Sequence, residues 1–242
     1  MNNEKNKLIE MLGKKLEIKD INMQNITNDV LCGKLKLNNT EMYVYIIEES
    51  SLENYQTFEG KIVSIIELCD KNELRVVVTK KESKISYAEV TGYFRNITEL
   101  KNAKYKCLFE KSAGVIAYKK INGEPHYLIT YSKKNFSGFP KGHVEYGEKE
   151  EDTAKREVFE EAGIKVELKK GFRESISYTV FDTPIQKEVV FFLGEMAEDE
   201  TVNINTNEIS KFEIVTFDKA KNILNEELMN VLKIAKEYID KN

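Results

Sequence analysis

The chain has 242 residues, of which 41% are hydrophobic and 32% are charged, and its formal net charge is −4 at pH 7. This length exceeds that of most single domains, so we expect two domains. The mild negative charge argues against general binding of duplex nucleic acid, which depends on a basic surface. No apolar run approaches the roughly 18 residues of a transmembrane helix, and the opening MNNEKNKLIEMLGKK has no signal-peptide pattern.

The cysteines indicate the redox environment. Cys32, Cys69 and Cys107 are odd in number and far apart, and their spacing does not fit a metal site. Free, reduced thiols are therefore expected, as in most cytoplasmic proteins. Together with the absence of membrane and secretion signals, this predicts a cytoplasmic protein.

Residues 1–108 have the pattern of a small β-rich domain. An amphipathic helix is expected near residues 8–12, and a closing helix near residues 87–95. Runs of strand-like residues lie between them, at 15–18, 30–36, 42–47, 60–68 and 73–79. Turn-forming pairs such as Asn38-Asn39 separate these runs. No linker rich in Gly or Pro follows, so pattern alone sets the boundary with a second domain at 109–242.

Residues 109–242 alternate between strand and helix patterns, which is typical of a mixed sheet covered by helices. Two strands are expected around an Asn122-Gly123 hairpin turn, at 114–118 and 126–131. Further strands are expected along the chain, at 165–168, 171–180, 187–196 and 212–216. A final amphipathic helix is expected over 226–238. The predicted fold class is therefore α/β, with a small β-rich, barrel-like domain preceding it.

The most informative stretch is residues 142–164, GHVEYGEKEEDTAKREVFEEAGI. A helix over 150–162 would place Glu157, Glu160 and Glu161 on one strip, because residues three or four apart share a face. Close carboxylates resist joint ionisation unless a positive charge lies between them. Mg²⁺ supplies such charge and prefers oxygen ligands. The simpler alternative is a solvated, glutamate-rich helix face.

The spacing of this stretch matches a known motif, the Nudix box G-x5-E-x7-R-E-U-x-E-E-x-G-U, in which U is aliphatic. All defined positions agree, namely Gly142, Glu148, Arg156, Glu157, Val158, Glu160, Glu161, Gly163 and Ile164. The sequence therefore resembles the Nudix hydrolases. The resemblance implies an α/β/α sandwich over 109–242 and hydrolysis of a nucleoside diphosphate that is linked to another moiety.

The resemblance also implies a metal site. Glu157, Glu160 and Glu161, with the backbone carbonyl of Lys141, would hold one or more Mg²⁺ ions, with Mn²⁺ as an alternative. Arg156 would orient Glu157 or offset the charge of the carboxylates. Its structural alternative is a pair with Glu160 at i, i+4 that only steadies the helix.

Two further carboxylates have open roles. Glu148 would anchor the loop before the helix or reach the metal through water. The box does not fix the general base, for which Glu157 and Glu208 are the two candidates. Gly142 permits a tight loop ahead of the helix, and Gly163 suits a left-handed residue at its end.

Two segments, one that runs into the start of the box and one that follows the box, resemble the asymmetrically cleaving bis(5′-nucleosyl)-tetraphosphatases. They are FPKGHVE at 139–145 and GFRESISY at 171–178. The expected reaction is thus cleavage of diadenosine tetraphosphate to AMP and ATP.

The residues expected to bind this substrate are Lys141, His143, Tyr131 and Tyr178. Lys141 and His143 would put positive charge beside a polyphosphate, and the two tyrosines would stack on a purine. Tyr178 also suits the core of a sheet, and Lys141 also suits a solvated loop.

Other functions remain open. Within the enzyme class, the alternatives are an RNA 5′-end pyrophosphohydrolase and a diphosphoinositol polyphosphate hydrolase. A nucleotide-sensing regulatory module is the alternative from a different class. The intact set of Glu157, Glu160 and Glu161 argues against a pure binding module.

Residues 31–67 resemble the barrel of soluble inorganic pyrophosphatases in the order of strands, acidic loop and glycine. That family clusters aspartates before the corresponding strand, whereas this chain has Asn38, Asn39 and Thr40 and no Asp between Asp29 and Asp70. The resemblance therefore implies a lost metal site. The domain would then serve recognition or assembly, through contacts with a partner or a second copy.

Overall fold

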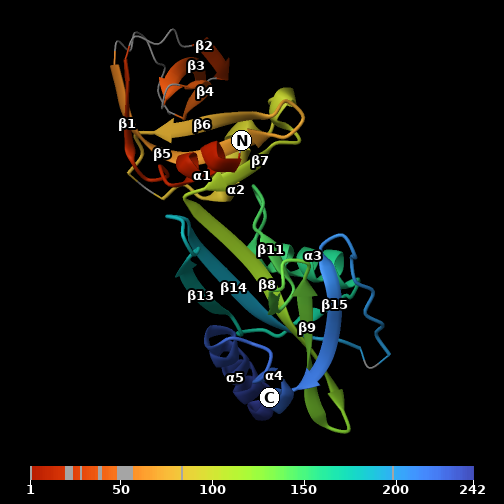
Figure 1. The fold of residues 1–242 in the computed structure, drawn as a ribbon. Coiled ribbons are helices and arrows are strands. Elements are labelled where there is room, and N and C mark those ends of the chain that lie inside the picture. Colours follow the sequence, from red (N-terminus) through yellow and green to blue (C-terminus); the bar gives the residue numbers. More distant parts are fainter. Residues whose placement is uncertain are drawn as a thin grey trace. The chain divides into compact units, whose positions relative to one another are not determined.

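The computed structural model describes residues 2–19, 24–27, 29–37, 40–47, 57–82, 84–197 and 199–242. The chain forms two units (Figure 1), one of Met1–Glu110 with Tyr178–Lys187 and one of Lys111–Ser177 with Glu188–Asn242. From the sequence pattern, residues 178–187 are expected in the C-terminal domain. In the structure they belong to the first unit, because Val180 and Ile185 pack in its hydrophobic core.

The first unit contains a mixed sheet with the strand order β1-β5-β6-β4-β3-β2, and β7 also pairs with β5. Its elements are α1 (Asn2–Ile9), β1 (Lys15–Lys19), β2 (Gln24–Thr27), β3 (Val30–Leu37), β4 (Thr40–Ile47), β5 (Thr57–Leu68), β6 (Glu73–Thr79), α2 (Tyr87–Phe94), η1 (Thr98–Leu100) and β7 (Lys104–Cys107). The pairing of β4 with β6 is parallel. The expected β-rich domain is thus observed, while the Asn38-Asn39 turn lies outside the described residues.

Strand β4 is central in this sheet. It lies between β3 and β6. Val44 and Ile46 belong to one buried cluster, and Tyr45 and Ile47 belong to another. Successive side chains of a strand point to opposite faces, so the sheet has a core on each side.

One helix covers each of these two cores. Leu8 of α1 joins the cluster of Val44, and Val90 and Phe94 of α2 join the cluster of Tyr45. Helix α1 ends at Ile9, earlier than the expected helix, and a turn with Gly13 at φ +82° follows it.

The second unit is built on the sheet β10-β9-β8-β14-β12, in which β11 also pairs with β8, β13 with β14 and β15 with β9. Its elements are β8 (Phe109–Ile121), β9 (Glu124–Ser132), β10 (Ser137–Gly138), β11 (Lys141–His143), α3 (Glu150–Ala162), β12 (Glu167–Leu168), β13 (Glu174–Thr179), β14 (Gln186–Glu195), β15 (Ile209–Thr216), α4 (Phe217–Ala220) and α5 (Glu226–Lys241). The start of β8, the end of β13 and the start of β14 belong to the first unit.

The second sheet lies between two helical layers. On one face Val115, Leu128 and Val190 pack with the apolar stripe of α3, which consists of Ala154, Val158 and Ala162. The intervening side chains, such as Ile116, Tyr127, Ile129 and Phe191, are buried on the other face. Figure 1 shows α3 and α5 on opposite sides of these strands. The expected α/β/α sandwich is therefore confirmed.

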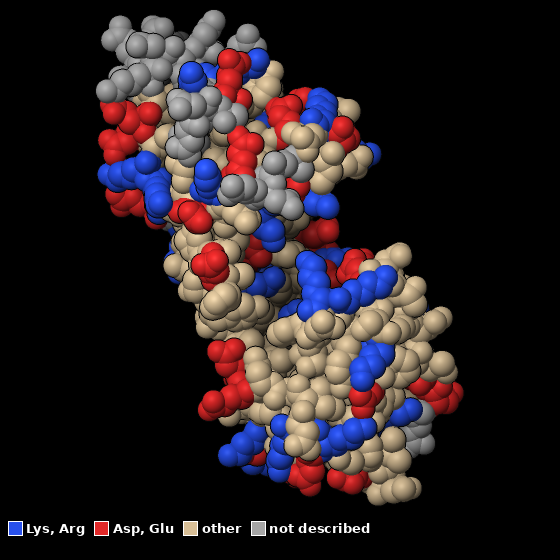
Figure 2. Space-filling view, in the orientation of Figure 1, with Lys and Arg blue, Asp and Glu red and all other residues tan. Residues whose placement is uncertain are grey.

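The surface carries both signs of charge. Figure 2 shows basic and acidic side chains interspersed over the visible face of each unit. Cys32, Cys69 and Cys107 are all free thiols, as expected. In the part of the chain that the structure describes, no helix has the length and apolar content to cross a membrane.

Candidate active site

Helix α3 presents the motif carboxylates. It covers Glu150–Ala162, the range predicted, and its first turn carries Glu150, Glu151 and Asp152. Acidic side chains at this end interact favourably with the helix dipole. The helix ends at Gly163, whose φ is +69° and whose N–H donates to the carbonyl of Phe159. A Cβ at Gly163 would also lie 2.8 Å from the carbonyl oxygen of Asn203, so a side chain is excluded there.

Arg156 joins four residues of the motif region. Its Nε and Nη2 donate to the two carboxylate oxygens of Glu148, at 2.8 and 2.9 Å. Its Nη1 donates to Oε1 of Glu157 at 2.7 Å and to Oε2 of Glu160 at 3.3 Å. Nη2 also donates to the backbone carbonyl of His143 at 3.0 Å. One guanidinium therefore orients Glu157 and also makes the i, i+4 pair with Glu160.

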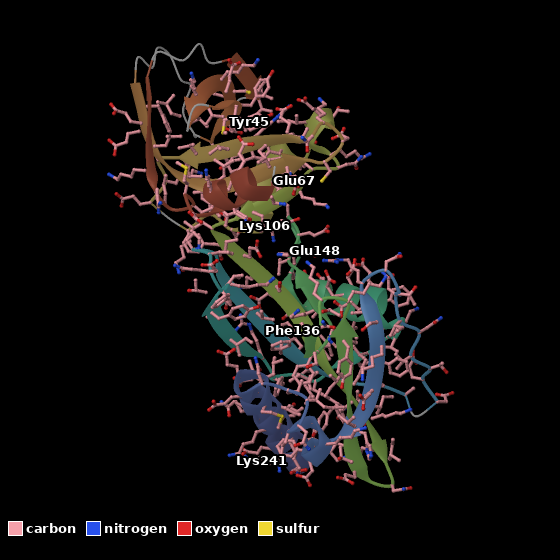
Figure 3. All side chains as sticks on the ribbon, in the orientation of Figure 1. Tyr45, Glu67, Lys106, Phe136, Glu148 and Lys241 are labelled. Atoms are coloured by element: carbon pink, nitrogen blue, oxygen red, sulfur yellow. The ribbon has the colours of Figure 1, made fainter. Side chains whose placement is uncertain are left out.

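Glu148 fastens the loop that precedes α3 (Figure 3). One of its oxygens, Oε2, accepts from the backbone N–H of Glu145 at 3.2 Å and from the hydroxyl of Thr153 at 2.6 Å. The hydrogen bond from Arg156 is the main cause that lowers the pKa of Glu148 to about 2. Glu148 is therefore an ionised anchor between the loop and α3.

The pKa values of Glu157 and Glu161 are both raised. Burial is the main cause that raises the pKa of Glu161 to about 7, and the charges of Glu157 and Glu208 raise it further. The ammonium and the backbone N–H of Lys141 act in the opposite direction. Burial also raises the pKa of Glu157, to which Glu160 and Glu208 add. These carboxylates thus lie close enough to resist joint ionisation.

Two glycines allow β11 to approach α3 and β8 closely. A Cβ at Gly142 would lie 2.1 Å from the carboxylate carbon of Glu157, and one at Gly114 would lie 2.3 Å from the carbonyl oxygen of Pro140. Distances below about 3 Å do not occur between such atoms, so neither position accepts a side chain without movement. The absence of a side chain at Gly142 lets Glu157 lie directly against β11, next to Lys141.

The loop that carries Glu208 is held at the end of α3. The backbone N–H of Asn205 donates to the carbonyl of Glu161 at 3.0 Å, and that of Asn203 donates to the carbonyl of Ala162 at 2.8 Å. The carbonyl of Glu208 accepts from the backbone N–H of Lys133 at 3.0 Å. These contacts fix the backbone near Glu208 against α3 and against the end of β9.

The donor set suits a hard divalent cation. Glu157, Glu160 and Glu161 provide only oxygen donors, the ligands that Mg²⁺ and Mn²⁺ prefer. A dication would also relieve the repulsion that raises the pKa of Glu157 and Glu161. Within the described residues, no three His, Cys, Asp or Glu side chains already converge as a metal site. Glu157 and Glu160 are instead hydrogen-bonded to Arg156.

The structure brings two of the four expected substrate-binding residues close to these carboxylates. Lys141 donates its backbone N–H to Glu161, and its ammonium acts on the same carboxylate. His143 lies two residues further along β11, with its carbonyl bonded to Arg156.

The two tyrosines are placed differently. Tyr131 donates its hydroxyl to Oε1 of Glu213 at 2.9 Å, and the ammonium of Lys211 lies 4.0 Å from the centre of its ring. Burial is the first cause that raises the pKa of Tyr131 to about 12. Tyr178 is part of the first unit, whereas the motif carboxylates are in the second.

One residue beside this site was not singled out from the sequence. Phe136 lies between β9 and β10 and is 47% exposed, with the ammonium of Lys141 5.5 Å from its ring centre. The available signal was a lone aromatic in the turn KKNFSG, three residues before the FPKGHVE segment.

Comparison with known proteins agrees with this geometry. The sequence model of the NUDIX domain matches residues 110–233. Because these are 124 of the 242 residues, just over half, the chain belongs to the NUDIX domain family.

Individual relatives share parts of the chain. The bis(5′-nucleosyl)-tetraphosphatase (asymmetrical) of Sus scrofa is 42% identical over 62 residues, which are 24% of this chain and 41% of that protein. An RNA pyrophosphohydrolase of Sulfurovum sp. (strain NBC37-1) is 30% identical over 141 residues, 53% of this chain and 88% of that protein. The chain therefore matches less than half the length of the first relative and most of the second.

A solved structure supports the fold of the second unit. The crystal structure of a C. elegans Ap4A hydrolase binary complex has a TM-score of 0.52 and 24% sequence identity, and the match covers 55% of this chain and 99% of that chain. At this identity the likeness shows the fold.

Proposed function

We propose that this chain is a metal-dependent hydrolase that cleaves a dinucleoside tetraphosphate asymmetrically, with diadenosine tetraphosphate giving AMP and ATP. The FPKGHVE segment and the similarity to the Sus scrofa tetraphosphatase support this choice of substrate. Hydrolysis at an RNA 5′ end is the second candidate, because the match to the RNA pyrophosphohydrolase spans most of that protein.

The observation that carries the proposal is the partly buried pair Glu157 and Glu161, one helical turn apart on α3. Burial is the first cause that raises both pKa values; the charge of Glu157 adds to the shift of Glu161, and the charges of Glu160 and Glu208 add to that of Glu157. Such a pair is costly unless a cation joins it. Mg²⁺ or Mn²⁺, when bound, neutralises charge on phosphate oxygens and makes water more acidic.

The residues around the pair have distinct positioning roles. Arg156 holds Glu157 and Glu160 through Nη1, and Glu148 holds Arg156 in turn. The three carboxylates do not converge among the described residues, so their side chains would rotate to bind a cation together while Arg156 stays paired with Glu148. The backbone carbonyl of Lys141 is the fourth proposed ligand.

Lys141 and His143 face the polyphosphate in this proposal. The ammonium of Lys141 already lies near Glu161, so it brings a fixed positive charge to the same place as the phosphates. Such placement orients the phosphate chain with respect to the attacking water, which is a major part of catalysis in phosphoryl transfer.

The base that accepts the proton of the attacking water is Glu157 or Glu208. Oε1 of Glu157 accepts from Arg156, which leaves Oε2 for the proton. Glu208 is held close by its loop, and its charge acts on both Glu157 and Glu161. A general base must lie within hydrogen-bond reach of the attacking water. Both side chains belong to the candidate site, so both are candidates for this role.

The test is product analysis with the full chain, Mg²⁺ and diadenosine tetraphosphate. We expect equal amounts of AMP and ATP, with ¹⁸O from labelled water in one of the two products only. Two molecules of ADP would refute asymmetric cleavage. Release of pyrophosphate from a 5′-triphosphorylated RNA, without cleavage of diadenosine tetraphosphate, would favour the second candidate.

A further inference from the structure

The turn between β9 and β10, residues 133–136, carries an exposed aromatic side chain, Phe136, on a hydrogen-bonded backbone. The N–H of Ser132 donates to the carbonyl of Phe136 at 2.8 Å, and the N–H of Phe136 donates to the hydroxyl of Ser132 at 3.2 Å. Asn135 has a φ of 60°, a conformation that Asn adopts more readily than most residues. The turn therefore presents Phe136 on an ordered backbone, although large apolar side chains are usually buried.

Two contacts connect this turn to the candidate site, one to the loop of Glu208 and one to a carboxylate of α3. The backbone N–H of Lys133 donates to the carbonyl of Glu208 at 3.0 Å. On the other side, the ammonium of Lys141 lies 5.5 Å from the centre of the Phe136 ring and also acts on the carboxylate of Glu161. Lys141 is thus the neighbour of both the aromatic ring and the proposed metal ligands.

We propose that Phe136 stacks against a nucleobase of the substrate, with Lys141 holding the adjoining phosphates. This inference rests on the proposed hydrolysis of a nucleoside polyphosphate. A base laid on Phe136 would cover its exposed ring, and the phosphates of the same nucleotide would extend past Lys141 towards Glu161. The side chains of Lys133 and Lys134 on the same turn are also exposed, so they add positive charge beside the phosphate chain.

Phe136 is better suited to this role than Tyr131. The ring of Tyr131 already bears the ammonium of Lys211 at 4.0 Å, and its hydroxyl is bonded to Glu213. Glu213 also accepts from Lys219 at 2.7 Å, which ties the tyrosine to α4. A base on the same face of Tyr131 would have to displace Lys211, which lies 4.0 Å from the ring centre. Lys141 lies further from the ring centre of Phe136, at 5.5 Å, and Phe136 is 47% exposed, whereas Tyr131 is half-buried.

The test compares a nucleotide with a polyphosphate that has no base. Calorimetry with the full chain and Mg²⁺ would measure binding of ATP and of inorganic tripolyphosphate to wild type and to Phe136→Leu. We expect Phe136→Leu to weaken ATP binding by about fivefold to a hundredfold, the range of a base–aromatic stack. Tripolyphosphate should bind unchanged, because it makes no stack. Phe136→Trp should keep the affinity for ATP.

A matched control is Phe159→Leu. Phe159 is 52% exposed on α3, and Lys165 lies 5.9 Å from its ring centre, so it resembles Phe136 in exposure and in its lysine neighbour. We expect this variant to bind ATP as wild type does. In steady-state hydrolysis of diadenosine tetraphosphate, Phe136→Leu should raise KM more than it lowers kcat.

Three results would overturn the assignment of Phe136. They are unchanged ATP binding by Phe136→Leu, an equal loss for ATP and tripolyphosphate, and a loss of ATP binding in Tyr131→Leu alone. Each can occur while wild type still cleaves diadenosine tetraphosphate, so the proposed function would survive them. Conversely, wild type could bind ATP through Phe136 and yet cleave no dinucleoside tetraphosphate. That result would refute the proposed reaction and support the stacking role of Phe136.

Discussion

Arg156 and Glu148 are joined by two parallel hydrogen bonds, Nε to Oε1 at 2.8 Å and Nη2 to Oε2 at 2.9 Å. This bidentate geometry is available to arginine and not to lysine. The remaining nitrogen, Nη1, donates to both Glu157 and Glu160. The paired Arg156 and Glu148 therefore position these two proposed metal ligands.

The first prediction follows from this geometry. Arg156→Lys should lower the rate of hydrolysis by about tenfold to a hundredfold, as removal of groups that orient metal ligands commonly does. Circular dichroism should show an unchanged fold. Arg173→Lys is the matched control, since Arg173 binds both oxygens of Glu150 at 2.7 and 3.0 Å, away from Glu157. Equal losses in the two variants would contradict a specific role for Arg156.

The second prediction concerns the proposed metal ligands. Replacing Glu160 and Glu161 together by Gln should abolish hydrolysis with Mg²⁺ and weaken Mn²⁺ binding measured by electron paramagnetic resonance. The fold should persist, because the neutral amides also remove carboxylate repulsion. Glu151→Gln, at the first turn of the same helix, is the control and should retain activity. Full activity in the double variant would end the metal assignment.

The third prediction separates the two candidate bases. Glu157→Gln and Glu208→Gln should both slow turnover at saturating Mg²⁺, and the true base should show a loss of about 10²–10⁴-fold. Single-turnover rates would compare the chemical step directly. If each variant loses less than a few fold, neither residue is the base.

The part of the site that lies on one helix could be predicted from the sequence. The spacing of Glu157, Glu160 and Glu161 required only the periodicity of one helix, and α3 has the bounds that were expected. The order of strand and helix patterns predicted a mixed sheet covered by helices, and the resemblance to the Nudix hydrolases implied the α/β/α sandwich. The helix itself depends on residues that are close together in the chain.

Contacts between residues that are far apart in the chain could not be predicted from the sequence. The segment Tyr178–Lys187 continues the strand pattern of its neighbours, and only the packing of Val180 and Ile185 assigns it to the first unit. The partners of Tyr131 are Lys211 and Glu213, about 80 residues away, so the sequence did not show that its ring is already covered. Phe136 looked like an ordinary turn residue, because the sequence did not show that its turn contacts Glu208.

The fourth prediction uses Gly142. Gly142→Ala would place a methyl group within 2.1 Å of the carboxylate carbon of Glu157, so the glutamate must move or β11 must shift. We expect hydrolysis to fall by tenfold or more, in line with the roughly 10²-fold cost of a misplaced catalytic group. The free energy of unfolding should be affected less than the rate of hydrolysis, because rotation of Glu157 relieves the clash. Wild-type kinetics in this variant would show that the position of Glu157 against β11 is unimportant.

The last prediction is the response of the first unit to acid. Arg75 is 3% exposed and donates to both oxygens of Glu99, at 3.0 and 2.7 Å, as well as to the hydroxyl of Tyr45. The hydrogen bonds from Arg75, and then that from Lys71, lower the pKa of Glu99 from 4.5 to about 2.

The sign of the effect follows from this lowered pKa. A carboxyl group whose pKa is lower in the folded state stabilises that state above its unfolded pKa, and the contribution is lost as the pH falls towards the folded value. The stability supplied by Glu99 should therefore be complete at pH 7 and should disappear between about pH 4.5 and pH 2.

Chemical denaturation of wild type and Glu99→Gln at several pH values would measure this contribution. The variant should be less stable at pH 7, and the difference between the two proteins should shrink below about pH 4.5, where wild-type Glu99 begins to take up protons on unfolding. The matched control is Glu89→Gln, which removes a carboxyl group from the capping box of α2 in the same unit. If the difference for Glu99→Gln is constant from pH 7 to pH 3, the pairing with Arg75 does not contribute to stability through its charge.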